Sequence, residues 1–172
     1  MGGLSANLSG AKQAIAYVAK KMTIGSNNDR PYSSPETREA ALCVPYERSI
    51  GVSGDFIEHA AREAIRYGCG NCGEQAAIAF MYLKDRGVLP LDYMHLMNAG
   101  GNRVHAFVVI GRPEGSSDRD IDSWGREAVV VCDPWDRRQA YAAYQIGTKM
   151  SLFNPGCYVE LFRRQGAIQS RR

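Results

Sequence analysis

The stretch that decides the fold is YGCGNCGEQAAIAFMYL, which covers residues 67–83. Its first part, Gly68 to Asn71, is rich in glycine and ends any helix that precedes it. From Ala76 to Leu83 almost every side chain is apolar, which is typical of a helix buried on most sides. We therefore predict a central, buried helix that begins near Cys72.

Two further helices are predicted on the N-terminal side of this stretch. The first covers residues 11–22, with Ser9 as its cap, and its apolar residues recur at helical spacing. The second covers residues 55–67 and presents one apolar stripe, which consists of Phe56, Ala60, Ala64 and Tyr67. Residues 25–53 are polar and rich in turn-forming residues, with one short helix expected over residues 35–42.

The C-terminal half predicts a β-sheet. Four runs rich in β-branched and aromatic residues suit strands, and they cover residues 93–97, 104–110, 128–132 and 157–162. The polar segment Gly111–Gly125 is expected to form a long hairpin loop. Helices followed by an antiparallel sheet predict an α+β fold in a single domain over residues 1–172, with residues 1–54 partly a less ordered arm.

Composition argues against several classes of partner. The 21 Lys and Arg residues exceed the 18 Asp and Glu residues by only three, which is too little to indicate nucleic acid or an anionic membrane. No apolar run approaches the roughly 20 residues that span a bilayer, and the N-terminus lacks the pattern of a signal peptide. We expect a soluble monomer with no membrane span, no nucleic-acid partner, no metal and no cofactor.

The five cysteines include the pair Cys69 and Cys72, which have the spacing of half a zinc site or of a redox pair. No second pair follows that would complete a tetrahedral zinc shell. One hypothesis is therefore a non-catalytic binding module in which these two cysteines have a structural role. At least one thiol is free in a monomer, because the number of cysteines is odd.

Cys72 is the candidate nucleophile. A thiol attacks as its thiolate, and the first turn of a helix favours that anion through its unpaired backbone N–H groups. The glycine-rich segment before Cys72 lets the backbone approach a substrate closely, and the Cys72 N–H is a candidate donor to an oxyanion. The alternative is that Cys72 is a small buried apolar residue, as many free cysteines are.

His105 and Asp133 are the candidate partners of this nucleophile. His105 opens a predicted strand, where an imidazole can face the tip of a neighbouring helix and exchange a proton with the thiol. Asp133 ends an apolar run and precedes Pro134, so its carboxylate is expected at the sheet edge, where it can orient His105. The alternatives are that His105 is a structural, hydrogen-bonded histidine and that Asp133 is an ordinary turn residue. If His105 is not the base, His95 is the next candidate.

Four more residues are candidates for the site. Asn71 and Gln75 flank the nucleophile and are possible donors to the oxyanion or the substrate carbonyl. Trp124 and Trp135 are possible walls of the cleft, although an aromatic residue in such a place often only packs at a sheet edge.

The segment Cys69-Gly70-Asn71-Cys72-Gly73, ahead of an Ala-rich helix, resembles the active-site segment of papain-like enzymes. Together with Glu74 and the later His105-Ala106 and Asp133-Pro134 pairs, it is more similar to the papain-fold toxins and effectors of bacteria. The likeness covers about residues 67–135. It implies Cys72 as nucleophile, His105 as base and Asp133 as third member, but Arg66 stands where papain-like proteases usually have a glutamine.

What the resemblance implies is a cysteine-dependent hydrolase that forms a thioester acyl-enzyme with a protein substrate, and it suggests a protein of a host cell as that substrate. Glutamine deamidation is the favoured reaction, and a papain-like thiol protease or a transglutaminase is the alternative, because all three use the same residues. A secreted or delivered effector or toxin, exported without a classical signal peptide, is the localisation that the resemblance suggests.

Overall fold

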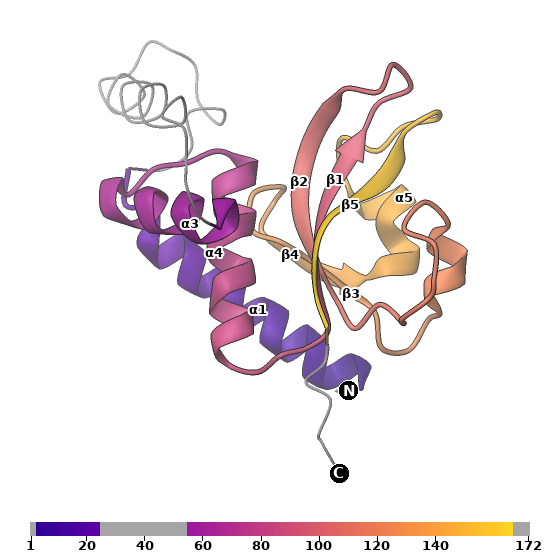
Figure 1. The fold of residues 1–172 in the computed structure, drawn as a ribbon, viewed down its shortest axis with the longest axis horizontal. Helices are drawn as coiled ribbons and strands as arrows, with labels where there is room; N and C mark the ends of the chain where they lie inside the picture. The colour runs from indigo at the N-terminus through magenta and orange to yellow at the C-terminus, as the bar shows by residue number, and fades with distance from the viewer. Residues whose placement is uncertain (1–2, 25–54, 167–172) are drawn as a thin grey trace.

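The computed structural model describes residues 3–24 and 55–166, so the short helix expected over residues 35–42 lies outside the described residues. Three helices cover one face of a five-stranded antiparallel sheet, and shorter elements cover the other face (Figure 1). The predicted α+β class is therefore correct. None of the described helices is long and apolar enough to cross a membrane.

Helix α1 (Leu4–Lys21) begins earlier than predicted, so Ser9 lies inside the helix and does not cap it. Leu4 and Leu8 pack against the hydrophobic core, and this contact extends the helix toward the N-terminus. The buried Asn7 side chain donates a hydrogen bond to the carbonyl of Ala128, which ties the first turn to the sheet layer. These tertiary contacts decide the start of the helix.

Helix α3 (Phe56–Tyr67) follows Asp55, whose carboxylate accepts a hydrogen bond from the Ile57 N–H at 2.9 Å. The predicted apolar stripe was wrong at its first residue. Phe56 is 46% exposed, and the residues that α3 buries are Ile57, Ala61 and Ala64. The buried face is therefore rotated away from Phe56, which packs edge-on against Phe162 instead.

Helix α4 (Cys72–Asp85) begins at the residue that the sequence predicts, and its apolar residues from Ala76 to Phe80 are all buried. A capping box fixes this start: Asn71 Oδ1 accepts from the Gly73 N–H at 2.9 Å, and Glu74 Oε2 accepts from the Asn71 N–H at 2.7 Å. The helix lies between α1, α3 and the sheet (Figure 1).

The sheet has the strand order β4-β3-β2-β1-β5, and every neighbouring pair is antiparallel. Its strands are β1 (Leu91–Met97), β2 (Arg103–Ile110), β3 (Val130–Asp133), β4 (Gln139–Ala142) and β5 (Tyr158–Gln165). All four predicted strands are present with shifted ends, and β4 was not predicted. The connection from β2 to β3 is the expected hairpin loop, and it contains the short 3-10 helix η2 (Ile121–Trp124).

Hydrophobic cores lie on both faces of the sheet. The alternate residues Ala106, Val108 and Ile110 of β2 face the helices. Phe107 and Val109 point to the opposite face and join a second core. That second core is closed by Trp124 in η2 and by the segment with η3 (Ala143–Gln145) and α5 (Ile146–Lys149). Burial on both faces explains why β2 is an almost continuous apolar run after His105.

Candidate active site

Cys72 occupies the first position of α4, at the N-terminal end of a helix that is otherwise buried. Its side chain is half-buried and carries a free thiol. The backbone N–H groups and the positive end of the helix dipole favour an anion at this position. The local structure therefore suits a thiolate.

The turn before Cys72 needs glycine at position 70. A Cβ on Gly70 would lie 2.8 Å from the Cβ of Glu74, the residue whose carboxylate closes the capping box. Tyr93, on β1, fixes the same turn from the sheet, because its hydroxyl donates to the Gly73 carbonyl at 2.8 Å. The position of Cys72 is thus set by contacts from both the helix layer and the sheet.

Asn71 and Gln75 also have structural partners in this turn. The Asn71 side-chain oxygen caps α4, and Gln75 is buried with its amide donating to the Gly70 carbonyl at 3.1 Å. The Gln75 amide therefore holds the glycine-rich turn against the helix. Their predicted role toward an oxyanion stays a prediction.

His105, near the start of β2, forms a buried pair with Asp133 at the end of β3. The distance from His105 Nε2 to Asp133 Oδ2 is 2.6 Å, and both side chains are 0% exposed. A carboxylate can only accept, so Nε2 carries the proton in this hydrogen bond. The pair holds the imidazole in one orientation, and the catalytic role predicted for His105 and Asp133 stays a prediction.

The other ring nitrogen of His105, Nδ1, has no hydrogen-bond partner within ordinary limits among the described residues. Burial by itself lowers the pKa of His105, but the hydrogen bond to Asp133, followed by the interaction with Cys72, raises it well above the usual 6.5. The Cys72 thiol therefore lies close enough to act on the ring. His105 is therefore protonated at neutral pH beside the Cys72 side chain.

Asp133 is itself fixed by the turn that follows it. Its second oxygen, Oδ1, accepts from the backbone N–H groups of Trp135 at 3.2 Å and Asp136 at 2.9 Å. The buried Asp136 carboxylate in turn accepts from the backbone N–H and the hydroxyl of Ser151, each at 2.6 Å. The orientation of Asp133 thus depends on a chain of hydrogen bonds that reaches the segment after α5.

The two tryptophans have different positions. Trp135 packs over His105, with ring centroids 5.3 Å apart, and it helps to exclude water from the buried pair. Trp124 lies in the second core, on the sheet face away from the helices, and its indole N–H donates to the Ser117 carbonyl at 2.6 Å. The expectation that Trp124 walls the cleft was therefore wrong.

The other described cysteines differ from Cys72 in burial and in bonding. Cys69 is disulfide-bonded and Cys72 is a free thiol, so the two do not pair with each other. Cys132 is fully buried, and burial raises the pKa of its thiol. Cys157 is a half-buried free thiol in the loop between Asn154 and the start of β5. Within residues 3–24 and 55–166, no three His, Cys, Asp or Glu side chains are grouped to hold a metal ion.

The reserve base, His95, lies on β1 among aromatic side chains. Its ring is 5.0 Å from that of Phe162 and 5.6 Å from that of Tyr93. Burial, followed by the charge of Arg103, lowers the pKa of His95 to about 4. His95 is therefore neutral at physiological pH, and His105 is the histidine that is paired with a carboxylate.

The sequence predictions missed two residues that support this site, Tyr93 and Asp136. Tyr93 falls within a predicted strand, where an aromatic residue indicates only packing. Asp136 follows the Asp133-Pro134 turn. A second aspartate in a turn could have indicated this role, since aspartates there accept hydrogen bonds from nearby backbone N–H groups.

Comparison of the chain with protein-family models, curated proteins and solved structures found no match.

Proposed function

We propose that the protein is a cysteine-dependent hydrolase of papain-like type that acts on protein substrates. The observation that carries this proposal is the buried His105–Asp133 hydrogen bond of 2.6 Å, which leaves His105 Nδ1 available to the free thiol of Cys72. A histidine oriented by a carboxylate and adjacent to a thiol at a helix N-terminus is the arrangement that nucleophilic catalysis requires.

The reaction follows from the positions of these groups. The Cys72 thiolate attacks the carbonyl carbon of an amide, and the electron pair of the C=O bond moves to oxygen, where the Cys72 N–H is a candidate donor. His105 then gives its Nδ1 proton to the departing nitrogen, and the C–N bond breaks to leave a thioester. Water, deprotonated by His105, attacks the thioester, the acid is released, and the thiolate and imidazolium are restored.

Glutamine deamidation is the reaction that we favour within this class. It rests on the resemblance of Gly70-Asn71-Cys72-Gly73-Glu74 to deamidase toxins and effectors, in which ammonia is the first product. A protease releases a peptide amine at the same step, and a transglutaminase replaces water with a second amine. A host-cell protein as substrate, and a role as a secreted or delivered effector, belong to the same proposal.

Mass spectrometry of the reaction products tests this choice. We expect a substrate protein to gain about one dalton for each glutamine converted to glutamate, because NH₂ is replaced by OH through the same acyl-enzyme. The Cys72→Ser variant is the matched control and should leave the substrate mass unchanged. Cleaved products would establish proteolysis in place of deamidation, and equal activity of the variant would exclude Cys72 as nucleophile.

A second measurement tests the nucleophile without any substrate. Iodoacetamide should label Cys72 faster than Cys157 near neutral pH, because only Cys72 lies beside His105 and the helix N-terminus. Equal labelling rates of the two free thiols would instead support the non-catalytic binding module.

A further inference from the structure

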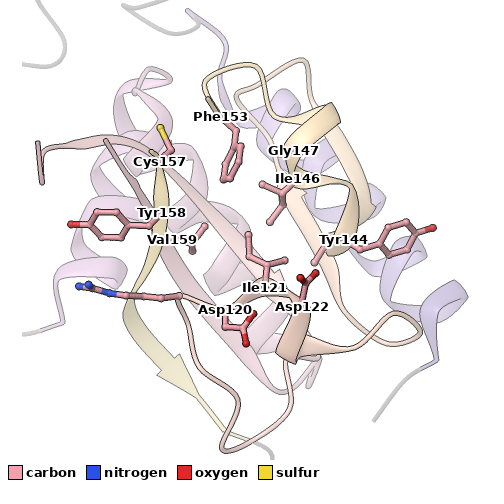
Figure 2. A pocket seen from close by; sticks show the side chains of 12 residues that line it. Asp120, Ile121, Asp122, Tyr144, Ile146, Gly147, Phe153, Cys157, Tyr158 and Val159 are labelled. Carbon is pink, nitrogen blue, oxygen red and sulfur yellow. The ribbon is translucent and has the colours of Figure 1, made fainter. Parts of the chain in front are cut away.

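A cavity of about 350 Å³ lies on the sheet face opposite the helix layer, well apart from the α4 N-terminus. It is enclosed by residues 119–122 of the hairpin loop, by the segment that carries η3 and α5, and by the start of β5 (Figure 2). This volume is at the small end of the range, roughly 300–1,000 Å³, that pockets for small molecules occupy.

Four apolar side chains form the floor of the cavity, which opens to solvent and is otherwise lined largely by polar groups. Figure 2 shows the side chains of Ile121, Ile146 and Phe153 turned toward the same space, with Val159 of β5 beneath them. All four belong to or pack against the second hydrophobic core. The floor therefore favours an apolar group of about the size of an aromatic ring.

Two exposed carboxylates lie at the rim of the cavity, while Arg126 lies over the ring of Tyr144 at another part of the lining. The carboxylates of Asp120 and Asp122 are exposed, and neither has a hydrogen bond or an ion pair with any residue in the described ranges. Arg119 also lines the cavity, but its guanidinium is paired with Glu160 at 3.3 Å and lies over the ring of Tyr158. A ligand with a positive charge complements this rim.

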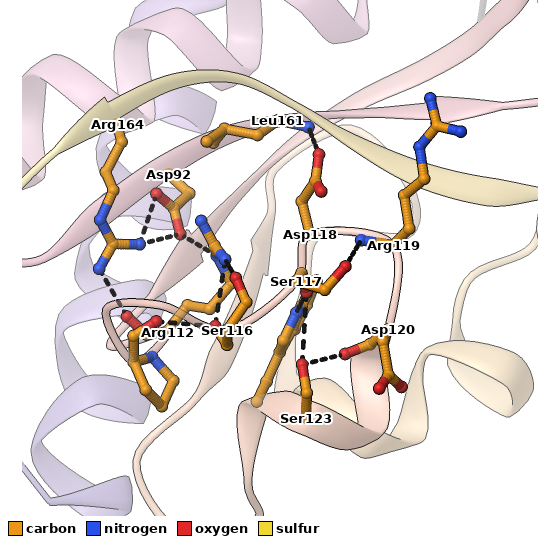
Figure 3. Close-up of polar contacts among 12 residues, drawn as sticks. Asp92, Arg112, Ser116, Ser117, Asp118, Arg119, Asp120, Ser123, Leu161 and Arg164 are labelled. Atoms are coloured by element: carbon orange, nitrogen blue, oxygen red, sulfur yellow. Dashed lines mark hydrogen bonds and ion pairs between the residues drawn. The ribbon is translucent and has the colours of Figure 1, made fainter.

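The loop that walls the cavity is fixed by buried polar contacts (Figure 3). Asp118 accepts from the Leu161 N–H of β5 at 2.8 Å, which fixes the loop directly beside Asp120. Nearer the start of the loop, Arg112 donates to Asp92 at 2.6 Å, and Arg164 reaches the same carboxylate at 3.0 Å. The wall is thus formed before any ligand arrives, which lowers the entropic cost of binding.

The opposite wall is fixed as well. Ser151, which lies between α5 and Phe153, is bound by the buried Asp136 carboxylate through two hydrogen bonds of 2.6 Å. We propose that this cavity is a binding site for a small organic cation with an apolar body, such as an arylalkylammonium ion. The apolar body contacts the floor, and the ammonium group lies between Asp120 and Asp122. This inference is independent of the chemistry at Cys72.

NMR titration of the full chain with three probes of similar shape tests the proposal. The probes are 2-phenylethylammonium, 2-phenylethanol and 3-phenylpropionate, which have a positive, a neutral and a negative polar end. We expect the methyl resonances of Ile121, Ile146 and Val159 to shift, with the ammonium binding about fivefold or more tightly than the alcohol, since each exposed ion pair contributes up to about 1 kcal/mol. The propionate should bind most weakly.

Two variants separate charge recognition from simple apolar contact. The double variant D120N/D122N should bind the ammonium and the alcohol equally, whereas E114Q, which removes an exposed carboxylate outside the cavity, should retain the preference. Equal binding of all three probes by the wild type would overturn the proposal. So would shifts confined to residues outside the cavity, or a preference that persists in D120N/D122N.

Discussion

Replacing Asp133 with asparagine is the sharpest perturbation of the candidate site. Asparagine has nearly the same volume as aspartate, so no cavity is created, and its side-chain oxygen can still accept from the N–H groups of Trp135 and Asp136. What the variant loses is the negative charge opposite His105 Nε2, at 2.6 Å in a fully buried pair. The asparagine NH₂ then faces Nε2, and because an NH₂ group only donates, the change disfavours both the protonated ring and the tautomer with hydrogen on Nε2.

The magnitude follows from the burial of this hydrogen bond. A hydrogen bond to a charged group contributes about 1.5–3 kcal/mol, which corresponds to about a ten- to hundredfold change in an equilibrium constant. Because Asp133 helps to raise the pKa of His105 above 6.5, its loss lowers that pKa and removes imidazolium from beside Cys72. The pKa of His105 in the wild type is about 10, and 1.5–3 kcal/mol corresponds to about one to two pH units, so the variant keeps the imidazolium at about pH 6 but largely loses it by about pH 9. We therefore expect similar rates of Cys72 alkylation at about pH 6, and a rate in the variant that is slower by up to about ten- to hundredfold at about pH 9.

The assay is alkylation by iodoacetamide over a range of pH, followed by peptide mass mapping. Cys157 is the internal reference, since it is a free thiol in the same chain. Glu114→Gln is the matched control, because its carboxylate is exposed and lies outside both proposed sites, and circular dichroism checks that each variant is folded. If Cys72 in folded Asp133→Asn reacts at the wild-type rate at about pH 9, the argument that Asp133 sets the protonation of His105 is refuted.

Four further variants test the support of the fold and the site. Asp92→Asn should lower the free energy of unfolding by about 3 kcal/mol, because two arginines, one of them buried, lose their shared carboxylate; urea denaturation measures this. Tyr93→Phe should cost about 1 kcal/mol through the lost hydrogen bond to the α4 turn, seen as a lower melting temperature. Gly70→Ala should cost about 1 kcal/mol or more, since its Cβ collides with Glu74 and opens the capping box. The pKa of His105 is higher in the folded chain than its ordinary 6.5, so the stability that wild type gains over His105→Gln should be full below about pH 6.5 and decline as pH rises, measured by denaturation at several pH values.

Matched controls distinguish these effects from general damage. Glu160→Gln breaks an exposed ion pair and should change stability by less than about 1 kcal/mol. Tyr144→Phe alters an exposed tyrosine and should leave the melting temperature unchanged. Gly147→Ala adds a Cβ in open space and should be tolerated. A loss of stability in these controls equal to that of the test variants would contradict the specific contacts described above.

The start of α4 was predictable because several local signals agree there. The glycine-rich turn, Asn71 before the helix and the apolar run after Ala76 all indicate the same boundary, and the capping box shows why. The same holds for β2 and β3, whose apolar runs are long. The elements on which Cys72, His105 and Asp133 lie could therefore be predicted from the sequence. Their relative positions depend on the tertiary structure.

The missed features depend on contacts between distant residues. Strand β4 has only four residues, Gln139–Ala142, and it exists because it pairs with β3 across a tight turn. The buried face of α3 consists of Ile57, Ala61 and Ala64, which join the core between the helices and the sheet, whereas Phe56 stays exposed and contacts Phe162, far away in the sequence. The spacing of apolar residues says nothing about contacts with distant residues, so the sequence of α3 was compatible with more than one choice of buried face.

Cys72 belongs to the helix layer, whereas His105 and Asp133 belong to the sheet. Separation of the layers would disconnect the thiol from the imidazole while the backbone hydrogen bonds within each layer persist. The reactivity of Cys72 therefore reports on the docking of the two layers, and it should fall under mild denaturing conditions before the far-ultraviolet circular dichroism changes. Alkylation of Cys72 could therefore be used to detect transient separation of the helix layer from the sheet in the native state.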